Sequence, residues 1–420
     1  MGGIEGDAIV AWAYLAAAHE HDDHEDDGCG RSSHVKRPRL HQNSDRLEQW
    51  DVLMGTLDEV QFQTMFRMDH AAFNTLCAIL TPALARKPVN KCPDRGGPLP
   101  VHYCVAIFLM WLGGARYIDI HSHLHVEKQT VFNVVDEVSI AIVDTMSSLI
   151  NLPILNPDEL AKISETFRQK YGMARGDIFK GCVGCMDGWL ARMHKPKYHP
   201  NPNSFYAYRY KEYGLAVQAV VDALARFVYV WADAPGSCHD SACFSACPLA
   251  FALGLGLMDP KYFIIADSAY RDEEWMLTPF THPRKGAQPE DEKLFNAILS
   301  GHRQVSERAF ALLVKKWLVF QRPLQMEPDK VGRIVVAAMI LHNFCIDTRQ
   351  SDATYSPVAN FTRTQVRHNA HEVTADGVVY TNEPMPPHES GYRSRTNDGK
   401  LRKNLYRFRV RQRLNAGLAV

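Results

Sequence analysis

The sequence predicts an α/β protein in which a mixed sheet with flanking helices follows an all-α region. Apolar residues recur at helical spacing from about residue 60 to 150, and the pattern changes near residue 178 to short apolar runs separated by turn residues. With 420 residues and 46% apolar composition, the chain is long enough for two or three domains and a sizeable core.

The N-terminal part is expected to contain a disordered segment and then a helical region. Residues 1–50 are polar and rich in His and Asp, which predicts disorder. Residues 51–170 are expected to form the helical region. Predicted helices cover residues 66–80, 102–112, 117–124 and 127–150, and the last of these has five apolar residues on one face: Val131, Val134, Val135, Val138 and Ile142. A short helix, a turn and a longer helix is the order of a helix-turn-helix module.

Residues 171–347 are expected to form the sheet domain. The predicted strands are residues 178–186, 213–221, 226–232 and 261–265, the second and third of which form a hairpin. The predicted helices cover residues 241–257, 291–320 and 331–345. Three adjacent strands, a helix, a strand and a helix match the RNase H-like core. Residues 348–420 are polar, with a basic stretch at 393–413, and are expected to form a flexible basic tail.

Four acidic residues stand beside these elements and are the candidate catalytic residues. Asp187 follows the first predicted strand, Asp240 ends a Pro-Gly loop, Asp267 follows the strand at 261–265, and Glu307 lies on a predicted helix. Carboxylates are the ligands that Mg²⁺ prefers, and a pair of divalent ions can clamp the attacking and leaving oxygens of a phosphodiester.

Each acid taken singly also has an ordinary structural alternative. Asp187 could form a turn with Gly188, Asp240 and Asp267 could cap helices, and Glu307 could be a solvated helix residue. In the RNase H-like topology, however, the strand bearing the first acid neighbours the strand that ends at the second, and a later helix supplies the third. Topology therefore selects Asp187, Asp267 and Glu307, and leaves Asp240 as a fourth candidate.

The phrases around these acids resemble those of the PIF/Harbinger superfamily of DNA transposases and their domesticated relatives. The similarity covers roughly residues 60–350 and rests on these phrases in the same order: Met186-Asp-Gly188, Val217-Gln-Ala-Val-Val-Asp222, Pro235-Gly-Ser-Cys-His-Asp-Ser241, Ala266-Asp-Ser-Ala-Tyr270, Ser306-Glu-Arg-Ala-Phe310 and Leu341-His-Asn-Phe-Cys345. The resemblance implies a DDE nuclease or transposase whose four acids, Asp240 included, bind a divalent metal cation, Mg²⁺ or Mn²⁺. It also implies a separate Myb-like partner protein.

The chain departs from the family pattern at two places. The hairpin turn is Asp222-Ala-Leu-Ala225, where the family usually has Gly, so the turn is expected to be longer or strained. Cys182 and Cys185 have the spacing of zinc ligands, but a second such pair is missing from the sequence, which favours buried thiols.

Double-stranded DNA is the expected partner, although the formal net charge of zero gives no global positive field. The candidate DNA-binding residues are Lys128, Gln129 and Asn133 on the helix at 127–150, and Arg192, Lys195 and Lys197 in a basic loop followed by several tyrosines. Packing and hairpin roles remain alternatives for both groups.

Localisation is expected to be nuclear, with shuttling to the cytoplasm left open. The basic cluster Lys36–Arg39 is a candidate nuclear localisation signal, and ten scattered cysteines are typical of reduced intracellular proteins. No stretch reaches 18 unbroken apolar residues, so a membrane span is not expected. The oligomeric state is open, a homodimer included.

The leading hypothesis is a metal-dependent DNA endonuclease or transposase of the Harbinger type. A catalytically silent, domesticated DNA-binding regulator with the same fold is the main alternative. A phosphoesterase acting on small substrates is a third; it predicts a closed pocket in place of a basic channel.

Overall fold

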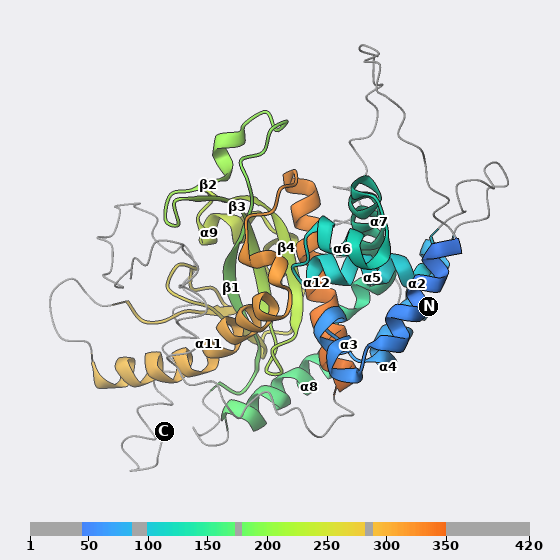
Figure 1. Cartoon of the computed structure of the whole chain (residues 1–420). Helices are drawn as coiled ribbons and strands as arrows, with labels where there is room; N and C mark the ends of the chain where they lie inside the picture. The colour runs from blue at the N-terminus through green and yellow to red at the C-terminus, as the bar shows by residue number, and fades with distance from the viewer. Residues whose placement is uncertain (1–43, 86–98, 173–178, 282–288, 350–420) are drawn as a thin grey trace. The chain divides into compact units, whose positions relative to one another are not determined.

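The computed structural model describes residues 44–85, 99–172, 179–281 and 289–349 (Figure 1). The chain divides into two compact units between Ser147 and Ser148. The sequence places this division near residue 170, but α8 (Pro157–Phe167) contacts β1 and lies in the second unit. Of the segment 1–50, expected to be disordered, residues 44–50 belong to a helix, α2 (Ser44–Thr56), and of the expected tail at 348–420, residues 348–349 belong to the helix Pro328–Arg349. Residues 1–43 and 350–420 lie outside the described residues.

The described part of the first unit is helical. After α2 come α3 (Glu59–Phe66), α4 (His70–Leu84), α5 (Val101–Leu112), α6 (Tyr117–Leu124) and α7 (Lys128–Met146). Asp58 begins α3 with a capping box, and α5 is buried from Tyr103 to Leu112 and ends at Gly113. The five predicted apolar residues of α7 are all buried. Three residues separate α6 from α7, and His125 turns the chain with a left-handed φ of 51°.

The second unit is built around a mixed sheet. Its strands are β1 (Cys182–Arg192), β2 (Tyr206–Ala207), β3 (Glu212–Val221), β4 (Phe227–Pro235), β5 (Phe263–Ile265) and β6 (Met276–Leu277). β1 lies between β3, to which it is antiparallel, and β5, to which it is parallel. β3 also pairs antiparallel with β4, which confirms the predicted hairpin, and β6 extends the sheet beyond β5 in parallel.

Helices cover both faces of this sheet. One face carries α11 (Glu290–Lys316), which contacts β1 and β3, and α12 (Pro328–Arg349), which contacts β4. On the other face, one apolar cluster joins the sheet to α8, α9 (Asp240–Ala246) and α10 (Pro248–Gly254); it includes Leu160, Met186, Val220, Phe244, Leu249 and Ile264. The single helix predicted over 241–257 is wrong, because Pro248 starts a new helix after the extended Cys247.

α12 is a core helix of the second unit. Its segment Pro328–Thr348 is long and apolar enough to cross a membrane, but 78% of that stretch is buried inside the protein. Burial against the sheet therefore accounts for its apolar character.

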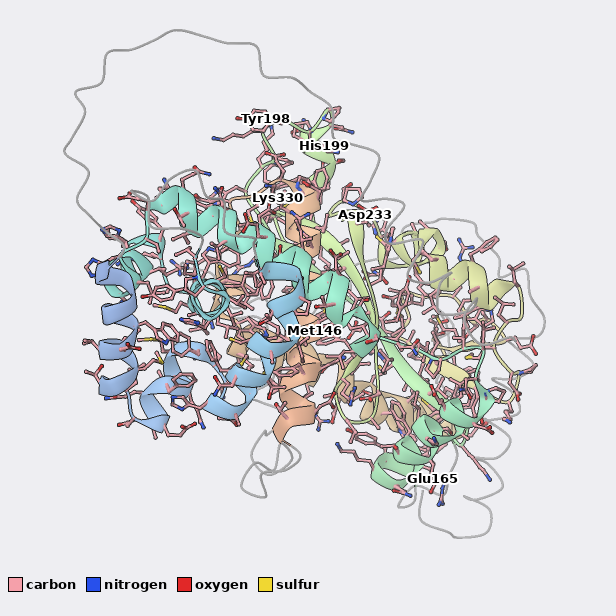
Figure 2. The ribbon with its side chains drawn as sticks, turned by 90° about the vertical axis from the view of Figure 1, so that its right-hand side faces the viewer. Met146, Glu165, Tyr198, His199, Asp233 and Lys330 are labelled. Carbon is pink, nitrogen blue, oxygen red and sulfur yellow. The ribbon has the colours of Figure 1, made fainter. Side chains whose placement is uncertain are left out.

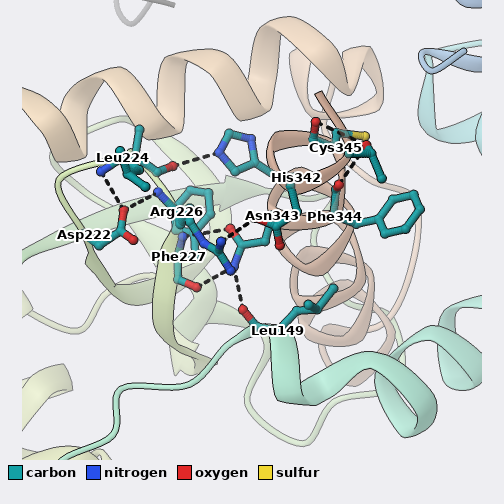
Figure 3. A network of polar contacts seen from close by, with 12 residues as sticks. Leu149, Asp222, Leu224, Arg226, Phe227, His342, Asn343, Phe344 and Cys345 are labelled. Atoms are coloured by element: carbon teal, nitrogen blue, oxygen red, sulfur yellow. Dashed lines mark hydrogen bonds and ion pairs between the residues drawn. The ribbon is translucent and has the colours of Figure 1, made fainter. Parts of the chain in front are cut away.

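Asn343 joins α12 to the edge of β4 (Figure 3). Its side-chain oxygen accepts from the Phe227 N–H at 2.9 Å, and its amide donates to the Phe227 carbonyl at 2.7 Å and to the Leu149 carbonyl at 2.8 Å. The side chain thus satisfies both backbone groups of Phe227 as a neighbouring strand would. The Leu341–Cys345 phrase carries this structural role.

The β3–β4 turn confirms the expected strain. Ala225 has a left-handed φ of 64°, a region that an L-residue enters at a cost. The Asp222 carboxylate accepts from the N–H groups of Leu224 and Arg226, and His342 Nε2 lies 2.9 Å from the Ala225 carbonyl oxygen. The surrounding hydrogen bonds therefore hold the turn in place without Gly.

Candidate active site

Asp187 lies inside β1. It pairs with Ala219 of β3, and Gly188 pairs with Gln218. The turn alternative for Asp187-Gly188 is therefore wrong. Asp187 Oδ1 accepts from the Gly188 N–H at 3.0 Å, and Oδ2 accepts from the Ser306 hydroxyl at 2.9 Å.

α11 covers the face of the sheet toward which Asp187 points. Cys185, two residues earlier on the same face, has its Sγ 3.4 Å from Ser306 Oγ. Trp189, two residues later, stacks on Phe310 with ring centroids 5.8 Å apart. These contacts fix the register of α11 on β1 and bring Ser306 to the carboxylate.

Asp267 follows β5 beside Asp187. Cys185 of β1 is in register with Ile265 of β5, so each aspartate stands two residues beyond a pair of parallel neighbours. Adjacent strands lie about 4.8 Å apart. Asp267 Oδ1 also accepts from the Ala269 N–H at 2.8 Å. This contact closes a local turn and caps no helix, and Oδ2 remains turned toward α11.

Arg303 of α11 lies between the two aspartates. Its Nη2 is 3.7 Å from Asp187 Oδ2 and 4.0 Å from Asp267 Oδ2. Glu307 follows one turn later on α11 and is exposed. Burial lowers the pKa of the Arg303 guanidinium, but Cys185, Asp187, Asp267 and Glu307 outweigh burial and raise it. Arg303 therefore lies beside two of the candidate acids, with Glu307 one helical turn away.

Asp240 approaches β1 from the opposite face. It is the first residue of α9, whose N-cap is His239. A Cβ built on Gly188 would lie 2.4 Å from Asp240 Oδ1. Because successive side chains of a strand alternate, the Gly188 position faces away from the side chain of Asp187. Only a residue without a side chain leaves room here for the Asp240 carboxylate.

Two buried polar residues hold Asp240, and sequence reasoning did not single them out. Gln218 Nε2 donates to Asp240 Oδ1 at 3.4 Å, and the Tyr270 hydroxyl donates to Gln218 Oε1 at 2.6 Å. Both side chains are buried. A signal was present, since Gln218 is the polar residue inside the apolar run from Val217 to Val221.

Burial raises the pKa of two of the acids. The pKa of Asp187 rises to about 6, with Arg303 and the Ser306 hydroxyl opposing the rise. The pKa of Asp240 is also raised, first by burial and then by the negative charge of Asp267. The site thus concentrates negative charge in a partly desolvated place.

Residues 186–343 match the sequence model of the DDE superfamily endonuclease family. The chain contains a DDE superfamily endonuclease domain. The matched range includes all four candidate acids, most of the sheet, α9, α10 and α11, and ends at Asn343, the residue that joins α12 to β4.

Relatives of known sequence confirm the resemblance to Harbinger transposase-derived nucleases. The chain is 23% identical to "Protein ALP1-like" of Arabidopsis thaliana over 331 residues, which is 74% of this chain and 78% of that protein. It is 27% identical to "Putative nuclease HARBI1" of Mus musculus over 228 residues, 53% of this chain and 60% of that protein. The Homo sapiens HARBI1 matches at 26% over 217 residues, 51% of this chain and 58% of the relative. No solved structure matches significantly.

DDE superfamily endonucleases depend on divalent metal, and the donors of this DDE domain are of the right chemical type. Carboxylate oxygens suit hard cations. Among the described residues, no group of three or more His, Cys, Asp or Glu side chains converges closely enough to hold a metal ion. Two of the carboxylates nevertheless already flank one cationic group, the Arg303 guanidinium. The gap between Asp187 and Asp267 therefore accepts positive charge.

The two cysteines with zinc-ligand spacing are core residues with free thiols. Cys182 and Cys185 are buried, as are Cys243 and Cys247. Burial raises the pKa of the Cys185 thiol to about 12. These positions fit the buried-thiol alternative.

The three basic candidates expected in one loop are divided: Arg192 is the last residue of β1, and Lys195 and Lys197 follow the strand. Arg192 donates to Glu212 Oε1 at 3.3 Å and to the Gln321 carbonyl at 2.6 Å, and its side chain is 19% exposed. Arg192 therefore serves the packing of β1 rather than an exposed surface. Lys195 and Lys197 are exposed.

The connection from β1 to β3 is basic and rich in exposed aromatic rings. Residues 194–211 contain four Lys or Arg residues and no Asp or Glu. Tyr198 is 86% exposed and Tyr208 77% exposed. Figure 2 shows Tyr198 and His199 together at the outer end of this connection. Burial raises the pKa of Tyr210, near the other end of the connection, and the negative charges of Asp240, Asp187 and Asp267 raise it further.

The first unit holds the other DNA-binding candidates on α7. Lys128, Gln129 and Asn133 are exposed at the N-terminal end of this helix. Gln129 Nε2 donates to Asn133 Oδ1 at 2.9 Å, and Lys128 Nζ lies 5.0 Å from the centroid of the Tyr117 ring. The three side chains form one exposed polar end beside α6.

Proposed function

We propose that this chain is a divalent-metal-dependent DNA endonuclease of the Harbinger type, with an RNase H-like catalytic domain. The observation that carries the proposal is the position of Asp187, inside β1, beside Asp267, just beyond the end of the parallel neighbour β5, under the helix α11 that bears Glu307. The antiparallel β4-β3-β1 strands continued by parallel β5 and β6 support the RNase H-like assignment.

Asp187, Asp267 and Glu307 are the residues that would hold the metal, Mg²⁺ or Mn²⁺. When bound, a divalent cation polarises a phosphodiester oxygen and lowers the pKa of a coordinated water. The Ser306 hydroxyl fixes Oδ2 of Asp187. Gln218 and Tyr270 orient Asp240, which approaches Gly188 from the other face of β1. Asp240 thus serves as the outer acid of the proposed site.

The DNA would lie along the connection from β1 to β3. Lys195 and Lys197 supply charge for backbone phosphates, and Tyr198 and Tyr208 supply exposed rings on which bases can stack. The exposed end of α7, with Lys128, Gln129 and Asn133, is the second proposed contact, in the manner of a helix-turn-helix.

Joining of DNA ends, a Myb-like partner and a nuclear location complete the proposal. The joining of DNA ends and the Myb-like partner rest on the relationship to Harbinger-derived proteins. The nuclear location rests on the basic cluster Lys36–Arg39, which lies outside the described residues. The chain spans less than two thirds of the HARBI1 proteins, so their properties reach it only as proposals.

A catalytically silent DNA-binding regulator is the second candidate. The observation that favours it is that, among the described residues, no three His, Cys, Asp or Glu side chains lie close enough together to hold a metal ion. Calorimetry separates the two functions, because the silent regulator binds DNA without binding Mg²⁺ or Mn²⁺.

The test of nuclease activity compares the full chain with Asp187→Asn and Glu307→Gln on plasmid DNA, with Mn²⁺ and with EDTA. We expect Mn²⁺-dependent nicking by the wild type and a loss of about a hundredfold or more in each variant. Glu290→Gln is the matched control, because Glu290 lies on the same helix about 25 Å before Glu307 at 1.5 Å per residue. Cleavage by Asp187→Asn at the wild-type rate would contradict the catalytic assignment.

A further inference from the structure

Arg303 is a largely buried cation between two of the carboxylates. Its side chain is 16% exposed, against 18% for Asp187 and 34% for Asp267. A charge largely removed from water destabilises the fold unless an opposite charge compensates it. The two aspartates supply that compensation.

The contacts of Arg303 are ionic and loose. Its Nη2 lies 3.7 Å and 4.0 Å from the two carboxylates, beyond hydrogen-bond distance. Its Nε is buried and has no hydrogen-bond partner among the described residues. A structural Arg–carboxylate pair instead forms parallel hydrogen bonds near 2.8 Å, about 1 Å shorter. The guanidinium is therefore held by charge rather than by a closed network.

The carboxylates need a cation even before any metal binds. Asp187 lies on β1 and Asp267 lies two residues beyond the end of the neighbouring strand β5, and Glu307 adds a third negative charge one turn from Arg303. Like charges on neighbouring backbone segments, partly out of water, repel each other more strongly than they would in bulk water. A positive charge between them removes most of that repulsion.

We propose that Arg303 is the resident counter-ion of the metal-free site and that a divalent cation binds Asp187 and Asp267 in competition with it. This inference rests on the proposed metal-dependent function and adds to it a counter-ion that competes with the metal. The guanidinium keeps the acids together without metal, and its charge lowers the affinity of the site for metal. On metal binding it moves away from the two carboxylates.

The test is calorimetric titration of the full chain with Mn²⁺, without DNA, in wild type, Arg303→Gln and Arg308→Gln. Arg308 is the matched control, because it lies on the same helix and donates to the Tyr171 hydroxyl instead of to the acids. Arg303→Gln is expected to bind Mn²⁺ about tenfold or more tightly than wild type, since one positive charge beside the metal is removed. Arg308→Gln is expected to bind like wild type.

Thermal melting supplies a readout that a purely structural role does not give. Without metal, Arg303→Gln is expected to melt below wild type, because its carboxylates have lost their counter-ion. With saturating Mn²⁺ the difference should shrink or reverse. A destabilisation of equal size with and without bound Mn²⁺ would show that Arg303 only packs.

A measurement on the wild type covers the case in which Arg303→Gln does not fold. The Arg303 Nε–H resonance, assigned by its absence in Arg303→Lys, is expected to shift on saturation with Mg²⁺. An unchanged resonance with bound metal overturns the proposal. The proposal is also overturned if the wild type binds Mn²⁺ and Arg303→Gln binds it no more tightly than the wild type does. If neither protein binds Mn²⁺, the proposed function fails together with this inference.

Discussion

Asp187 and Gly188 show how two neighbouring residues serve two faces of one strand. Asp187 faces α11, where Ser306 and Arg303 meet it, while the bare Cα of Gly188 gives the Asp240 carboxylate its room on the other face. Alternation along β1 thus divides the candidate acids into an inner set under α11 and an outer Asp240.

Burial of Asp187 predicts a pH dependence of stability. Its pKa is raised from 3.8 to about 6, so the native state holds a proton that the unfolded state releases. The contribution of Asp187 to the free energy of unfolding is therefore highest below about pH 4 and declines through about pH 6, by at most about 3 kcal/mol. Asp187→Asn should lack this decline, so it should gain stability relative to wild type over that range. Urea denaturation at several pH values measures the free energy of unfolding of both proteins. If that free energy changes with pH in the same way in wild type and Asp187→Asn, the prediction is wrong.

Gly188→Ala should displace Asp240. The new Cβ would lie 2.4 Å from Asp240 Oδ1 and 3.2 Å from Gln218 Nε2, so one of these groups must move. We expect a loss of about 1–3 kcal/mol in the free energy of unfolding and, for a shift of about 1 Å, a fall of up to about a hundredfold in Mn²⁺-dependent cleavage. Gly254→Ala is the control, because nothing lies within 4 Å of its added Cβ. If Gly188→Ala and Gly254→Ala have the same stability and the same cleavage rate, Asp240 does not belong to the active site.

At the level of elements, the helices matter as much as the strands. α11 brings Arg303, Ser306 and Glu307 to the sheet, and α12 closes the edge of β4 through Asn343. Apolar periodicity predicted both helices and the β3–β4 hairpin, because burial of a face fixes the spacing of apolar residues. The division of acids between the faces of β1 could not be read from the sequence, since the predicted strand ended at Met186. Arg303 had only the signal of lying four residues before Glu307, and charged helix pairs are usually solvated.

Asn343→Ala should loosen α12 from the sheet. The substitution leaves the N–H and C=O of Phe227 and the carbonyl of Leu149 without the partners that Asn343 provides. Leaving buried polar groups unpaired should lower the free energy of unfolding by about 2–4 kcal/mol. Chemical denaturation measures this loss. Asn203→Ala, at an exposed asparagine of the same unit, should change it by less than about 0.5 kcal/mol; a similar loss in both variants would be the contrary result.

At the scale of the whole molecule, a chain of zero net charge has to bind DNA through local charge. The connection between β1 and β3 is the described segment that best meets this need, because it carries basic residues and exposed tyrosines without any acid. Composition alone gave no such indication, whereas the local sequence around Lys195 and Lys197 did. Arg192 shows the limit of that reasoning, since its charge is used by Glu212 within the fold.

Removing Lys195 and Lys197 together should change the salt dependence of DNA binding. If each contacts one phosphate, the slope of log affinity against log salt should become shallower by about 1.8, at about 0.9 per contact. Fluorescence anisotropy with a duplex oligonucleotide in EDTA measures the slope. Lys261→Ala is the control, because Lys261 is paired with Asp259. An unaltered slope in the double variant would show that DNA binds to another surface of the protein.

The central claim is that Asp187 and Asp267, with Glu307, hold a divalent metal under α11. Its most direct test is a crystal of the full chain soaked in Mn²⁺, with the metal located by anomalous scattering. The account predicts a peak about 2.2 Å from oxygens of both Asp187 and Asp267, with the Arg303 guanidinium withdrawn from them. Mn²⁺ bound elsewhere, with Arg303 still between the two aspartates, would contradict it.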